Sequence, residues 1–168
     1  DIDLQGFDGG GVPDPAKAWI NSITVTSYNG GGHKITNLYA DAALGGMGSF
    51  ASNLNDGGTI QNLTIEEVDL TGSGGNEFGA LVNQVGGSGT ICDVHIRGVT
   101  HRTMRNPGSG GAGLGGLVGL SHSGTLTIAN SDVDLTIDAN DNRSAGGLVG
   151  SFQNELVITG SHSLGTLV

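Results

Sequence analysis

The sequence predicts an all-β fold: a right-handed parallel β-helix, or β-solenoid, of about five coils with a short N-terminal capping helix. Three observations support this prediction. A glycine-rich phrase recurs every 31 to 36 residues, a period typical of solenoids. Short alternating apolar runs follow its copies, and 33 of the 168 residues are glycine whereas three are proline. The right hand follows from the strong preference of parallel crossovers.

The first element is expected to be a short helix that begins near Asp14. Asp is a favourable N-cap residue, and Pro15 suits the first helical position. Trp19, the only tryptophan, is expected to pack over the first coil and to cover its open strand edges. We therefore assign residues 1–28 to an N-terminal cap and residues 29–168 to the solenoid, within a single domain overall.

The next elements are expected to be pairs of short strands joined by a polar corner. Residues 58–65 and 89–96 both begin with Gly-Thr-Ile, continue with a polar pair, and end with a second apolar run. Residues 32–38 fit the same frame with one residue inserted. Such a bent chain wraps around a core, which a flat hairpin strand does not do. The corner positions expected to be equivalent are Asn37, Asn62 and Asp93.

The glycine-rich phrase itself is interpreted as scaffold. It occurs at residues 78–82, 115–119 and 146–150, with a looser copy at 47–51. Its glycines permit tight turns and close approach between neighbouring coils. The large apolar residue of each copy is expected to form one interior column, made of Phe50, Leu81, Leu117 and Leu148.

Three loops of unequal length, residues 71–77, 100–113 and 138–145, fall at the same point of the coil. Insertions in solenoids collect on one face, often the binding face, so the loops are expected to lie side by side. Their candidate binding residues are Thr71, Asn76, Arg102, Arg105, Asn140 and Asn142. Residues 164–168 are strand-like to the last position, which leaves an open edge that invites pairing.

The composition excludes several function classes. The formal net charge is −10, which opposes binding to nucleic acid, and no run is long enough to span a membrane. Cys92 is the only cysteine, so no internal disulfide forms, and its apolar strand indicates a small core residue. The five histidines lack zinc-site spacing. No cofactor is expected apart from calcium, whose candidate ligands are Asp138, Asn140 and Asp141.

Two further alternatives rest on stacked outward residues. Paired carboxylates on neighbouring coils suit glycoside hydrolysis, and the candidates are Glu66, Glu67, Asp69, Asp132 and Asp134. A threonine ladder suits ice binding, and the residues taken as equivalent are Thr59, Thr90 and Thr125. A single threonine column is a small surface for binding ice. The chain also has few aromatic residues on which a sugar ring could stack.

The Gly-Gly-Leu-Val-Gly phrases, each followed by a polar turn and a Thr-rich strand, resemble the GLUG repeats of bacterial surface and secreted proteins. The lead-in at residues 29–38 also resembles the segment that precedes such repeats. The resemblance covers the chain from about Asn29 onward. It implies a β-solenoid, an extracellular or cell-surface location, and an architectural or adhesive role without catalytic residues.

The function predicted from the sequence is therefore a noncatalytic, extracellular structural or adhesive module that presents its loops to a partner. The partner is another protein chain, a copy of itself, or a surface glycan. The alternative is a filament subunit that assembles end to end through the strand edge at residues 164–168. A carbohydrate-active β-helix enzyme is the third class.

Overall fold

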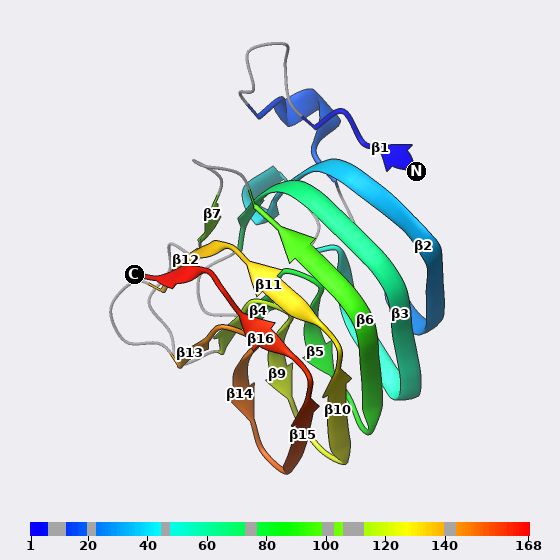
Figure 1. The fold of residues 1–168 in the computed structure, drawn as a ribbon. Helices are drawn as coiled ribbons and strands as arrows, with labels where there is room; N and C mark the ends of the chain where they lie inside the picture. The colour runs from blue at the N-terminus through cyan, green and yellow to red at the C-terminus, as the bar shows by residue number, and fades with distance from the viewer. Residues whose placement is uncertain are drawn as a thin grey trace.

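The computed structural model describes residues 1–6, 13–19, 23–44, 48–72, 77–98, 103–105, 113–139 and 144–168. Within these ranges the chain is a β-solenoid of parallel strands, as predicted (Figure 1). Two one-turn 3-10 helices, η1 (Pro15–Lys17) and η2 (Ala42–Leu44), accompany the strands. The strands before the first loop are β1 (Ile2–Asp3), β2 (Thr24–Asp41) and β3 (Ala51–Thr71).

The following coils are divided into shorter strands. The third coil contains β4 (Phe78–Gly79), β5 (Val82–Val85), β6 (Gly89–Arg97) and β7 (Thr103–Arg105). The fourth contains β8 (Leu114–Gly115), β9 (Val118–Ser121), β10 (Thr125–Ala129), β11 (Asp132–Asp134) and β12 (Thr136–Asp138). The final coil contains β13 (Ala145–Gly146), β14 (Val149–Phe152), β15 (Glu155–Thr159), β16 (His162–Ser163) and β17 (Thr166–Leu167).

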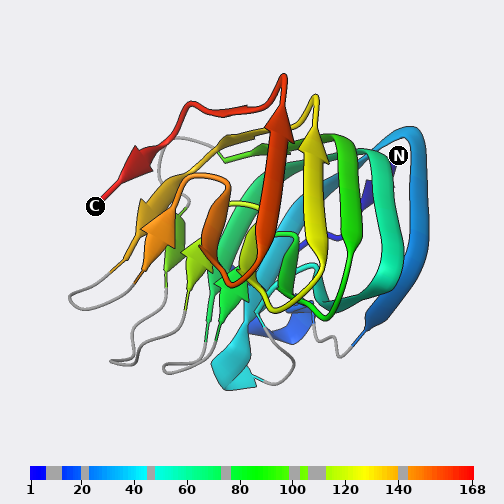
Figure 2. The same cartoon turned by 90° about the horizontal axis from the view of Figure 1, so that it is seen from below.

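Equivalent strands of successive coils stack in parallel, which gives the solenoid its faces (Figure 2). On the first face, β3 pairs with β5, then β9 and β14. On the second face, β3 is followed by β6, β10 and β15. The third face continues from β6 to β11 and β16, and the fourth from β3 to β7, β12 and β17. β4, β8 and β13 form a separate three-stranded sheet.

The register also gives the number of coils. One position on the second face is occupied successively by Tyr28, Ile60, Ile91, Ile128 and Ile158. Five stacked positions enclose about four complete turns, so the expected number of about five coils is slightly too high as a count of full turns. The three isoleucines in the middle of this column are fully buried. Alternation of inward and outward side chains along each strand therefore builds one continuous core.

The polar corners are formed by residues with a left-handed backbone. Asn62, Asp93, Asn130 and Gly160 occupy one corner, and their φ angles are 53°, 52°, 49° and 60°. Asn and Asp adopt this conformation more readily than most residues, which explains the polar corner signal in the sequence. Asn37 does not belong to this corner. It is equivalent to Glu67, because residues 30–32 lie opposite Asn62 and Asn37 comes at the following corner.

The expected N-terminal helix is the single turn η1. Asp14 caps it, since its Oδ1 accepts a hydrogen bond from the Ala16 amide at 3.0 Å. Trp19 lies over the first coils as predicted: its ring stacks on Phe50 at 6.0 Å, and its Nε1 donates to the Phe50 carbonyl at 3.0 Å. The division between a cap over residues 1–28 and a solenoid over 29–168 stays a prediction, and β2 begins at Thr24.

The residues expected to form the interior column lie on successive coils. Phe50, Leu81 and Leu117 are buried. Backbone hydrogen bonds join the last members, because the Leu81 amide donates to Leu117 and the Leu117 amide donates to Leu148. Leu148, which belongs to the final coil, is only partly buried. None of the helices within the described ranges is long and apolar enough to cross a membrane.

Candidate interaction surfaces

The three predicted loops leave the solenoid at one corner. The strand positions before them are in register, since Thr71 pairs with Arg105 and Arg105 pairs with Asp138. The positions after them are also in register, because Phe78 and Ala145 both pair with Leu114. The roots of the loops are therefore stacked one above another. Cross-coil register of this kind places insertions from different coils beside one another.

The structure describes only part of the predicted binding set. Thr71 is buried at the end of β3, and its hydroxyl has no hydrogen-bond partner among the described atoms. Arg105 ends strand β7, which corrects the interpretation of residues 100–113 as a loop throughout. The alternating Thr-Met-Arg sequence pairs with β3 and β12 and continues the fourth face. Four of the predicted binding residues lie outside the described residues: Asn76, Arg102, Asn140 and Asn142.

The calcium prediction stays untested. Asp138 is exposed at the end of β12, whereas Asn140 and Asp141 lie outside the described residues. In the described part of the chain, no three His, Cys, Asp or Glu residues are grouped so as to hold a metal ion.

A charged cluster on the third face is a feature that the sequence analysis missed. Asp132 is buried, and its two carboxylate oxygens contact His95 and Arg97 of the preceding coil. The register brings these residues together, since His95 pairs with Asp132 and Arg97 with Asp134. Farther along this face, Lys34 Nζ lies 2.8 Å from Glu66 Oε1. The cluster links successive coils through charge-assisted contacts.

This arrangement bears on the carboxylates considered for glycoside hydrolysis. One carboxylate oxygen of Asp132 contacts Arg97 and the other contacts His95, and Asp69 is buried on the fourth face. Glu67 occupies a corner with φ of 57°. Arg97 separates Glu66 from Asp134 in the stack. The register thus distributes these acids over two faces and a corner.

The predicted threonine column forms, but one of its three expected residues is wrong. Thr59 and Thr90 are equivalent, and the next residue in the column is Thr127, not Thr125. Thr125 follows a glycine, as Thr59 and Thr90 do, but the turn before β10 places the residue two positions later opposite Thr90. The column continues to Val157 in the final coil, so threonine does not extend to the C-terminal end.

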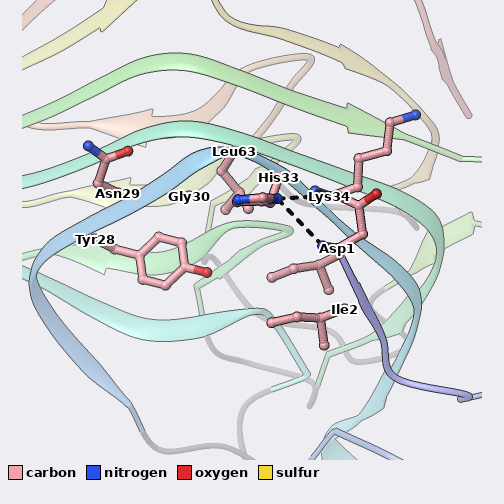
Figure 3. Close-up of a pocket in the computed structure, with 9 residues that line it drawn as sticks. Asp1, Ile2, Tyr28, Asn29, Gly30, His33, Lys34 and Leu63 are labelled. Atoms are coloured by element: carbon pink, nitrogen blue, oxygen red, sulfur yellow. Dashed lines mark hydrogen bonds and ion pairs between the residues drawn. The ribbon is translucent and has the colours of Figure 1, made fainter.

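A pocket of about 190 Å³ lies between the N-terminal strand and β2 (Figure 3). Ile2, Tyr28 and Leu63 supply apolar atoms to its wall. At the rim, the Lys34 amide donates to Asp1 Oδ1 at 2.9 Å, and His33 Nδ1 lies 3.6 Å from the same oxygen. His33 and Asp1 are mostly exposed to solvent, so water screens their interaction.

The final coil, residues 145–167, forms an uncovered apolar end of the solenoid. Phe152, Ile158 and Leu167 are 52%, 45% and 53% exposed. The residues beneath them in the same columns, one coil earlier, are Ser121, Ile128 and Ile137, which are 2%, 0% and 2% exposed. The exposure thus comes from position at the end of the stack. In Figure 1, β15 and β16 form the edge opposite β2.

The chain is similar to segments of two much larger proteins. It is 30% identical to halomucin of Haloquadratum walsbyi over 184 residues, which cover 94% of this chain and 2% of that protein. It is 28% identical to an immunoglobulin A1 protease of Streptococcus sanguinis over 145 residues, which cover 65% of this chain and 7% of that protein.

No protein-family profile matches the chain, so the GLUG resemblance is not shown, and no solved structure matches it. Halomucin and the immunoglobulin A1 protease are cell-surface or secreted proteins. The comparisons thus connect most of this β-solenoid with short segments of extracellular proteins.

Proposed function

We propose that the protein is a noncatalytic structural and adhesive module of the extracellular surface, related to GLUG-repeat solenoids. The stacked roots of the three loops are the observation that carries the proposal, because Thr71, Arg105 and Asp138 bring the loops to one corner. A rigid scaffold that positions variable loops is a common way to build a binding surface. The similarity to cell-surface and secreted proteins supports the location.

The test is a binding experiment with loop replacements. The labelled chain is applied to a glycan array and to immobilised cell-surface protein. Residues 73–76, 106–112 and 140–143 are then replaced by Gly-Ser segments of the same lengths. We expect the bound signal to be lost while Tm changes by no more than about 2 °C, because loop replacements leave the core contacts in place. Gln61→Ala, on the second face, is the control. Binding that survives all three replacements contradicts the proposal.

A second candidate is self-assembly through the final coil. It is favoured by the exposure of Phe152, Ile158 and Leu167 at a strand edge. The enzyme alternative has its own test on the same glycan panel. Hydrolysis that disappears in Glu67→Gln or Asp69→Asn contradicts the noncatalytic proposal, whereas no turnover is expected from the wild-type chain.

A further inference from the structure

One corner of the second coil carries a tripeptide of the kind that receives N-linked glycans. Asn62-Leu63-Thr64 has the pattern Asn-x-Thr, in which the middle residue is not proline. It lies within β3, where the second face turns into the third. Leu63 pairs with His33 of the preceding coil and with Val94 of the following one. The surroundings of this corner are therefore set by coils on both sides.

The two polar side chains of the tripeptide lie on the outside of the coil. Asn62 and Thr64 are partly exposed, whereas Leu63 between them is 1% exposed and belongs to the core. Asn62 has a φ angle of 53°, which turns the chain at the corner. Its Nδ2 amide donates to Asn29 Oδ1 at 3.1 Å, in a contact at the protein surface. The nitrogen that carries the sugar in an N-linked glycan therefore faces solvent here.

The preceding coil leaves room beside this nitrogen. Residues 30–32, which lie opposite Asn62, are all glycine. A Cβ atom at Gly30 would lie 2.4 Å from the Asn62 carbonyl oxygen, whereas a Cβ atom at Gly32 would meet nothing within 4 Å. N-glycosylation replaces one of the two Nδ2 hydrogens, so the remaining hydrogen can still donate to Asn29. A glycan at this corner therefore requires neither a new backbone conformation nor the loss of this hydrogen bond.

The same corner lacks this tripeptide in the coils that follow. The next coil has Asp93 there, and the one after it has Asn130, whose second following residue is Asp132 and supplies no hydroxyl group. In the whole sequence, Asn62 and Asn142 are the asparagines with serine or threonine two positions later. Asn142 lies outside the described residues. Asn62 is thus the described asparagine that combines the tripeptide with an outward position.

We propose that Asn62 is an acceptor site for an N-linked glycan. The donor is a sugar chain that is linked through phosphate to a lipid. In the transfer, Asn62 Nδ2 forms a bond to the anomeric carbon of the first sugar, and the bond from that carbon to the phosphate oxygen breaks. The lipid phosphate leaves with the electron pair, and the amide gives up one proton to a base of the transferase. The inference rests on the extracellular location in the proposed function and is independent of loop binding.

A glycan at Asn62 covers the border between two faces of the solenoid. The threonine column with Thr59 and Thr90 lies on one side of this border, and the charged cluster around Asp132 lies on the other. A bulky, hydrated group at this place keeps other chains from packing on either face. The loops leave the solenoid at a different corner, after the fourth face. The modification therefore leaves the proposed binding loops accessible.

The test follows the glycan by mass spectrometry. The 168-residue chain, preceded by a secretion signal, is produced in a eukaryotic secretory host, and protein from both the medium and the cells is collected. Peptides are compared before and after treatment with peptide N-glycosidase, which releases the glycan and converts the asparagine to aspartate. We expect a glycan on Asn62 in the wild type, which is retained in Thr64→Ser and lost in Thr64→Val. Asn62→Asp is the matched control for folding, since aspartate occupies this corner one coil later.

A wild-type chain without a glycan on Asn62 overturns the inference, and so does a chain that is modified on Asn142 alone. A glycan on Asn62 that persists in Thr64→Val also overturns it. The inference fails as well if the glycosylated chain loses the strand signal in circular dichroism that Asn62→Asp keeps, because the glycan then does not fit the corner. Loop binding is measured on the same samples. Lost binding with a glycosylated Asn62 counts against the proposed function alone, whereas intact binding with an unmodified Asn62 counts against this inference alone.

Discussion

The sharpest prediction concerns the glycines of the repeated phrase, and it is tested by replacing Gly115 with alanine. A Cβ atom at Gly115 would lie 2.0 Å from the Val118 carbonyl oxygen and 2.5 Å from the Gly150 amide nitrogen. Both neighbours are backbone atoms, and the Gly150 contact comes from the next coil. Neither can move aside as a flexible side chain would. The methyl group therefore has to force the two coils apart.

The expected loss of stability follows from this overpacking. Inserting a methyl group into a well-packed site costs about 1–3 kcal/mol, and a contact with backbone belongs at the upper end, about 3 kcal/mol. For a chain of this size, 1 kcal/mol shifts Tm by about 2–4 °C, so we expect a loss of about 6–12 °C. Thermal unfolding followed by far-ultraviolet circular dichroism measures it.

Gly86→Ala is the matched control. A Cβ atom at Gly86 would meet only the Leu54 carbonyl oxygen, at 4.0 Å. Its φ is not in the left-handed range, so alanine is tolerated there, and the lower entropy of the unfolded chain offsets any small cost. We expect Tm to stay within about 2 °C of the wild type. Equal melting temperatures for Gly115→Ala and Gly86→Ala would refute the assignment of the phrase as a close-packed scaffold.

Three further predictions concern single positions. Asp93→Ala is expected to lower the free energy of unfolding by about 1 kcal/mol, because alanine disfavours the left-handed backbone. Asp93→Gly is expected to be nearly neutral, and urea titration of the two variants measures the difference. Burial and then the Asp93 charge raise the pKa of the Cys92 thiol, so less thiolate is present at neutral pH. Iodoacetamide should therefore alkylate Cys92 more slowly than it alkylates glutathione at pH 7, and the rate at Cys92 should rise as the pH passes the ordinary thiol pKa. Equal rates for Cys92 and glutathione at pH 7 contradict this prediction. Asp132→Ala is expected to lower the free energy of unfolding, measured by urea titration, by about 1–2 kcal/mol. Asp134→Ala, at an exposed position, is expected to lower it little. Equal effects of the two substitutions would show that the charged cluster does not stabilise the fold.

Much of the scaffold could be predicted because its signals are local. The repeat period gives the parallel stack, and the polar residues Asn62 and Asp93 mark corners that need a left-handed backbone. The helical turn η1 was also predictable, since Asp14 and Pro15 form a local start signal, and Trp19 packs on Phe50 as expected. These features depend on residues near one another in the chain.

Errors arose where the outcome depends on register between coils. Residues 30–32 lie opposite Asn62 and Asn37 lies opposite Glu67, so the sequence match assigns Asn37 to the wrong corner. A similar shift put Thr125 in the column of Thr127. The cluster around Asp132 was missed for the same reason, because its partners His95 and Arg97 lie 35 to 37 residues away. Only stacked coils bring such residues together.

Hydrogen exchange tests the stacked-coil account most directly. Amide exchange is measured by mass spectrometry at a protein concentration low enough to keep the chain monomeric. Protection follows the local free energy of opening, which is greatest for strands paired on both sides. We predict slow exchange in β3, β6 and β10, which have a strand on each side, and fast exchange in β15 and β16, which end the stack. Equal protection of β10 and β15 in the monomer would contradict the account.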